Sequence, residues 1–131
     1  MQAGWVRGEE RESGTPLPEI PPFEATAAVD WRGDSAWHPT GRLETRYVHK
    51  QDRVSEGFGE DATPSFALVH LRGSIRPWDN VTLEAGIENL LDRLYHEHLT
   101  REALLPVGDL AAGDEIPGPG RTFYLNVRVA W

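Results

Sequence analysis

Residues 121–131 read RTFYLNVRVAW, and this stretch decides the fold. Every second residue in it is apolar, and the residues between are mostly polar. The apolar set is Phe123, Leu125, Val127, Val129 and Trp131, and the other set is Tyr124, Asn126, Arg128 and Ala130. Side chains alternate between the two faces of a strand, whereas a helix would scatter these residues around its circumference. The stretch is therefore predicted to be a β-strand with one wholly apolar face.

The same alternation recurs upstream, in residues 23–32, 41–49, 65–75 and 81–89, and more weakly in residues 2–11. In residues 23–32, for example, Phe23, Val29 and Trp31 share a face, and Glu24 and Asp30 share the other. The sequence therefore predicts an all-β fold of about six antiparallel strands, each roughly ten residues long, joined in an up-and-down meander.

The connections between these segments alternate in length: residues 12–22, 50–64 and 96–120 are long, whereas residues 33–40 and 76–80 are short. Successive connections of a meander lie at opposite ends of the sheet. One end is therefore expected to carry tight turns, helped by Pro77 and Asp79-Asn80, and the other end long polar loops.

Two environments could cover the apolar face. A small soluble antiparallel β-barrel or sandwich that binds a ligand would turn it inward. In an outer-membrane barrel it would face lipid, and ten tilted residues would cross the apolar band of about 25 Å. The loop asymmetry favours the membrane, as do aromatic residues placed like an interfacial girdle: Phe23, Trp31, Tyr47, Phe123 and Trp131. We favour a partial transmembrane β-barrel and keep the soluble module as the alternative.

Composition excludes several classes of protein. The chain has 131 residues, a formal charge of −8 and no Cys, which suits one domain without disulfides. It has no basic patch, so we expect no nucleic-acid partner. The first residues, MQAGWVRGEE, have neither a basic start nor an apolar stretch, so we expect no signal peptide.

The polar residues do not predict an enzyme or a cofactor. No Ser, His and Asp arrangement has the spacing of a nucleophilic site. His96-Glu97-His98 could turn two imidazoles toward one metal ion, but no third ligand accompanies them. We therefore assign the tripeptide to loop packing and expect no metal site.

Two C-terminal stretches, LEAGIENLLDRLYHEHL (83–99) and IPGPGRTFYLNVRVAW (116–131), resemble the end of TonB-dependent outer-membrane receptors. That family has an Asn-Leu-Phe-Asp-x-x-Tyr block, a loop, a Pro-Gly-Arg group and a closing strand with a terminal aromatic residue. The matching residues are Asn89, Leu90, Asp92, Tyr95, Pro119, Gly120, Arg121 and Trp131, with Leu91 in place of the usual Phe.

The resemblance implies a role for the whole chain. Residues 1–131 would be the C-terminal part of a receptor barrel of about 22 strands, an open sheet lacking the plug domain and signal peptide. The strand residues Phe123, Leu125, Val127, Val129 and Trp131 would form the signal read by the outer-membrane insertion machinery.

The family also implies the partners. These would be outer-membrane lipid of a Gram-negative cell, the rest of the barrel and plug, TonB acting through the plug, and a metal-chelate ligand. A ferric siderophore is the expected cargo, with copper or cobalamin as alternatives.

Overall fold

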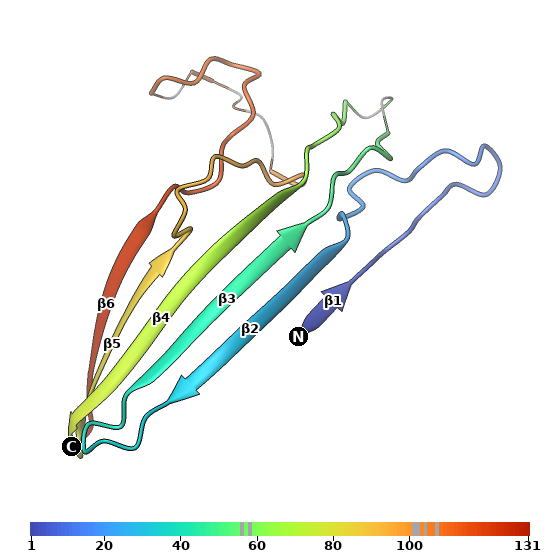
Figure 1. Cartoon of the computed structure of the whole chain (residues 1–131). Helices are drawn as coiled ribbons and strands as arrows, with labels where there is room; N and C mark the ends of the chain where they lie inside the picture. Colours follow the sequence, from blue (N-terminus) through green and yellow to red (C-terminus); the bar gives the residue numbers. More distant parts are fainter. Residues whose placement is uncertain (56, 58, 101–102, 104, 107) are drawn as a thin grey trace.

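The computed structural model describes residues 1–55, 57, 59–100, 103, 105–106 and 108–131. It contains six strands: β1 (Gln2–Gly4), β2 (Glu24–Arg32), β3 (Thr40–Val48), β4 (Phe66–Trp78), β5 (Val81–Glu88) and β6 (Thr122–Val129). They form one sheet in the order β1-β2-β3-β4-β5-β6, and every neighbouring pair is antiparallel. Figure 1 shows a curved, open sheet, so the predicted all-β meander is confirmed.

Two segments differ from the prediction. Residues 2–11 do not form one long strand, because β1 ends at Gly4 and the chain then pairs with itself through the bridge between Glu9 and Pro16. Residues 76–78 are not a connection, because β4 continues to Trp78, which pairs with Val81. The register shifts between Ile75 and Trp78, and such an irregularity can hold a proline within a strand.

The connections separate into two ends of the sheet, as predicted (Figure 1). The short-turn end holds residues 33–39 and 79–80 together with the C-terminus. The loop end holds the described residues of the three long connections, which run from residue 5 to 23, from 49 to 65 and from 89 to 121.

Little of the sheet is buried. The main cluster of buried residues consists of Val48, Phe66 and Leu68, with Tyr95 packed against it. It lies at the loop end, where β3 ends beside the start of β4 and Tyr95 of the chain after β5 packs against them. The described part of the chain contains no helix with the length and apolarity that crossing a membrane requires.

Candidate functional site

One face of the sheet is apolar, and none of the residues that the structure describes covers it. Strand register aligns a row across five strands in which each residue pairs with the next: Val29, Leu43, Leu71, Ile87 and Phe123. Val29 remains 70% exposed and Phe123 67% exposed. Exposed apolar patches of this extent mark a surface that contacts something other than water.

Four of the five predicted insertion residues lie on this face in β6, and Trp131 follows two positions after the strand ends. Phe123, Leu125, Val127, Val129 and Trp131 are all at least half exposed. Strand β6 pairs only with β5 among the described residues, so its outer edge offers free backbone N–H and C=O groups. The terminal strand therefore combines an open edge with an apolar stripe.

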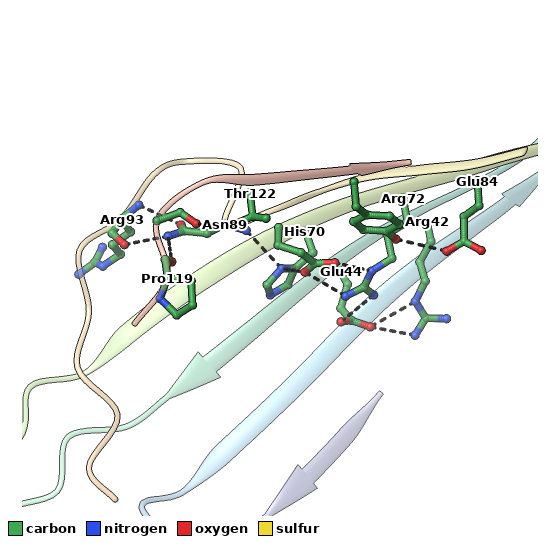
Figure 2. A network of polar contacts seen from close by, with 12 residues as sticks. Arg42, Glu44, His70, Arg72, Glu84, Asn89, Arg93, Pro119 and Thr122 are labelled. Carbon is green, nitrogen blue, oxygen red and sulfur yellow. Dashed lines mark hydrogen bonds and ion pairs between the residues drawn. The ribbon is translucent and has the colours of Figure 1, made fainter. Parts of the chain in front are cut away.

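The opposite face carries charged residues that pair across strands. Arg42 of β3 bonds Asp30 of β2 at 3.2 Å and Glu44 of its own strand at 3.0 Å. Arg72 of β4 bonds the same Glu44 at 3.2 Å and Glu88 of β5 at 2.9 Å. Figure 2 shows the Arg42, Glu44 and Arg72 part of this ladder.

The ladder has one more contact between β4 and β5, and it continues from β5 to β6. His70 contacts Glu88 at the β4–β5 step. On β6, the Tyr124 hydroxyl donates to Glu84 at 3.3 Å, and its ring lies against Gly86 of β5, where an added Cβ would be 2.4 Å from a ring carbon. A glycine opposite an aromatic ring lets the ring cover the backbone. Each step from β2 to β6 is thus bridged on this polar face.

Arg46 of β3 connects the sheet to the loop that follows β5. Its guanidinium group bonds Glu24 of β2 at 2.8 Å and also Glu97, which lies in the loop after β5. It also sits 5.8 Å from the centre of the Phe66 ring, within the range of a cation–π contact. Glu97 is the middle residue of the His96-Glu97-His98 tripeptide, so one member of that tripeptide packs against the sheet.

The Asn-Leu block and the Pro-Gly-Arg group come together where β5 leaves the sheet and β6 enters it. The Asn89 side chain donates to the carbonyl groups of Arg93 and Pro119, at 2.9 and 3.2 Å, and accepts from the Arg93 N–H. Asp92 accepts the N–H of Arg121 at 2.8 Å. Figure 2 shows the bonds that join Asn89 to Arg93 and Pro119. We call this arrangement the clasp.

Tyr95 completes the clasp. The Gly118 N–H donates to the Tyr95 carbonyl at 2.8 Å, and the Tyr95 ring lies so close to Gly118 that a Cβ there would meet it at 2.1 Å. The same ring packs against Phe66, with the ring centres 4.8 Å apart and the ring planes tilted by 40°. Burial, and secondarily the charge of Glu97, raises the pKa of the Tyr95 phenol. The clasp joins residues up to 30 positions apart and closes the base of the loop between them.

The two leucines of the Asn-Leu block, Leu90 and Leu91, have surroundings that differ from those of the clasp residues. The Leu90 N–H donates to the Val69 carbonyl at 2.8 Å, which extends the β4–β5 pairing by one bond. Leu91 is 66% exposed, so the position where the family usually has Phe makes few contacts here.

The three loops enclose an open cavity of about 760 Å³ at the loop end. Its lining includes His96 and His98, which face different partners: His96 is 3.4 Å from Glu115, and His98 is 3.2 Å from the Thr63 hydroxyl. Within the described residues, no group of three or more His, Asp or Glu side chains is placed to hold a metal ion.

Comparison with known proteins relates the chain to a family of membrane receptors. Residues 2–90 match the family model described as TonB dependent receptor-like, beta-barrel. The chain is 24% identical over 134 residues to the ferric enterobactin receptor of Pseudomonas aeruginosa, a match that covers 96% of this chain and 18% of that protein. The solved structure of the copper transporter OprC superposes with a TM-score of 0.83 at 26% identity, over 98% of this chain and 20% of that one. The chain thus spans about a fifth of the length of these relatives.

Proposed function

The chain belongs to the TonB-dependent receptor-like β-barrel family, and from this membership we propose that it forms part of the wall of an outer-membrane receptor that imports a metal chelate. We place residues 1–131 in the C-terminal part of the barrel domain, because Asn89 to Tyr95, Pro119 to Arg121 and the closing strand resemble the end of such receptors. The role is one of transport, and no enzymatic step is assigned.

The observation that carries the proposal is the exposed apolar row from Val29 to Phe123. Exposing such a surface to water costs a free energy of roughly 25 cal/mol per Å² of apolar area, whereas contact with hydrocarbon carries no such cost. The charged residues lie on the other face, and in bacterial outer-membrane barrels the polar side chains face the lumen. The apolar face would therefore contact outer-membrane lipid of a Gram-negative cell.

The polar face would then line the lumen, where the plug domain of a receptor lies. TonB would supply energy through that plug, and the free edges of β1 and β6 would pair with further strands of the barrel. Unpaired backbone groups in lipid each cost several kcal/mol, which is the physical reason for expecting those neighbours.

We assign the outer-membrane insertion signal to Phe123, Leu125, Val127, Val129 and Trp131. Their exposure along an open strand edge supports this role, because an insertion machine that works by strand pairing needs both features.

A ferric siderophore is the cargo that we propose first, since a ferric enterobactin receptor is among the relatives. Copper is the alternative supported by the structural similarity to a copper transporter. Cobalamin remains a third possibility within the class.

Sedimentation of the purified chain with and without detergent tests the membrane assignment. We expect aggregation in plain buffer and a discrete species in detergent micelles. A detergent-free monomer with a cooperative melt would instead support the soluble module.

Exchanging the corresponding fifth of the ferric enterobactin receptor for this chain tests the cargo. Uptake of radioactive iron as ferric enterobactin, compared with uptake of radioactive copper, reads out the preference. Retained iron uptake supports the siderophore class, and a switch to copper uptake supports the alternative. A chimera that reaches the outer membrane but imports neither argues against both.

A further inference from the structure

Three arginines lie on the polar face near the short-turn end: Arg32 on β2, Arg76 on β4 and Arg128 on β6. Arg32 and Arg76 line a shallow pocket of about 330 Å³ together with His38 and the hydroxyl residues Thr40, Ser74 and Thr82. Arg128 is the register partner of Thr82, so it stands beside the same pocket. We call these three residues the arginine row.

The arginine row differs from the arginines nearer the loop end. Arg42, Arg46 and Arg72 each bond two carboxylates. In contrast, no member of the arginine row forms an ion pair with any carboxylate in the described part of the chain, and all three are exposed.

The acidic residues near the short-turn end do not neutralise the row. The turns carry Asp34 and Asp79, and neither lies within ion-pair distance of these guanidinium groups. Asp30 is bonded to Arg42, and Glu84 accepts from Tyr124. Three uncompensated positive charges therefore occupy one region of a face on which the other ionic groups are largely paired.

The spacing of the row indicates the kind of partner. Strands are about 4.8 Å apart, so arginines on alternate strands start about 10 Å apart and the row extends over about 19 Å. One phosphate or carboxylate would contact all three only if the outer two side chains bent toward the middle one. A segment with several carboxylates can contact all three, because it presents a charge to each guanidinium group. The net charge of the whole protein, −8, disfavours a long polyanion such as a nucleic acid.

We propose that the arginine row docks an acidic segment of the polypeptide that fills the barrel lumen. The inference rests on the proposed function, because only then does this face enclose a protein domain. The arginine row would hold that domain near the short-turn end. There the row would supply positive charge on a face whose other charged groups are either paired with one another or acidic.

Binding of a fluorescent hexaglutamate peptide to the chain in detergent micelles, followed by anisotropy, tests the docking. Arg32→Gln, Arg76→Gln and Arg128→Gln are each expected to weaken binding about threefold, as for an exposed ion pair. If the contributions multiply, the triple variant loses about 27-fold. The Arg→Lys variants keep most of the affinity because they keep the charge.

The matched control is Arg11→Gln, which removes the same charge from the loop end and should leave binding unchanged. A far-UV circular dichroism spectrum of each variant establishes that its sheet is intact. Competition with inorganic phosphate and with free glutamate, at constant ionic strength, separates a segment site from a small-anion site.

Absence of peptide binding, or binding that survives the triple Gln variant, overturns the inference. Displacement by phosphate or glutamate as effective, per charge, as by unlabelled peptide also overturns it, since the row would then hold small anions. A chain that forms a discrete species in detergent but fails these tests would leave the receptor proposal standing, because sedimentation tests that proposal separately.

Discussion

Replacing Gly86 with alanine tests how β5 and β6 hold together. A Cβ at this position would lie 2.4, 2.5 and 2.6 Å from three atoms of the Tyr124 side chain, well inside contact distance. Either the ring leaves its place, which breaks its bond to Glu84, or the strands shift. Overpacking of this kind costs about 1–3 kcal/mol. Without the clash, alanine in a strand would be more stable than glycine by about 0.5–1 kcal/mol.

Urea unfolding in detergent micelles, followed by tryptophan fluorescence, measures this cost. The control is Gly41→Ala, whose Cβ would meet the Trp31 ring at an ordinary 3.6 Å, so its stability should be unchanged or slightly higher. Removing the ring with Tyr124→Ala should make Gly86→Ala harmless, giving a coupling energy of about 1–3 kcal/mol in the double-mutant cycle. If Gly86→Ala alone is as stable as the parent, or if the two changes are additive, the ring does not cover the glycine and the reasoning fails.

Three further predictions concern the lipid face, the clasp and the loop end. Leu71→Lys places a charge on the apolar face and should cost about 2–4 kcal/mol in lipid vesicles, measured by urea unfolding; a cost near zero would mean that this face does not meet hydrocarbon. Asp92→Ala removes the acceptor of the Arg121 N–H and should cost about 1 kcal/mol while speeding proteolysis of the loop, and an unchanged cleavage rate would exclude a role in closing its base. Because the pKa of Tyr95 is raised in the folded protein, the folded state favours the neutral phenol. The contribution of this group to the stability of the fold is therefore full below the unfolded pKa of about 10, and it is lost as the pH rises through the folded pKa. An absorbance titration of the Tyr124→Phe protein should therefore contain a late phenolate that a further Tyr95→Phe change removes, and its persistence in that double variant would refute the assignment.

Strand positions could be predicted because the alternation of one strand is a local property. In residues 122–129 each side chain reveals its own face, and the same holds for β2, β3 and β5, and less cleanly for β4. Alternation failed at residues 2–11. There Gly8 packs against Leu17 and Ile20, and the Leu17 N–H bonds the Gly8 carbonyl, so a contact within the loop takes the backbone away from the sheet.

The contacts of the candidate site could be predicted only in part. The block from Asn89 to Tyr95 could be recognised from its residues, but nothing in its spacing reveals that Asn89 reaches Pro119. Asn89 adopts a positive φ of 50°, which turns its side chain into a position that a strand pattern does not describe. Likewise, the residues of the polar face could be predicted because they occupy alternate positions along each strand. The pairing of Arg72 with Glu88 could not, because it depends on the register between β4 and β5.

Away from the buried cluster at the loop end, cohesion in this sheet has to come from a source other than a core, because no second layer covers its apolar face in the described part of the chain. The free energy that holds neighbouring strands together must then lie in the backbone ladder and in side-chain bridges on the polar face. Arg42 spans β2 and β3, Arg72 spans β3, β4 and β5, and Tyr124 spans β5 and β6. Exposed ion pairs contribute only about 0–1 kcal/mol each, but linked pairs on a rigid sheet lose less side-chain entropy than isolated ones. The polar face of this protein therefore adds side-chain bridges between neighbouring strands to the backbone ladder, whereas Arg32, Arg76 and Arg128 bridge no strands among the described residues and are left for a partner.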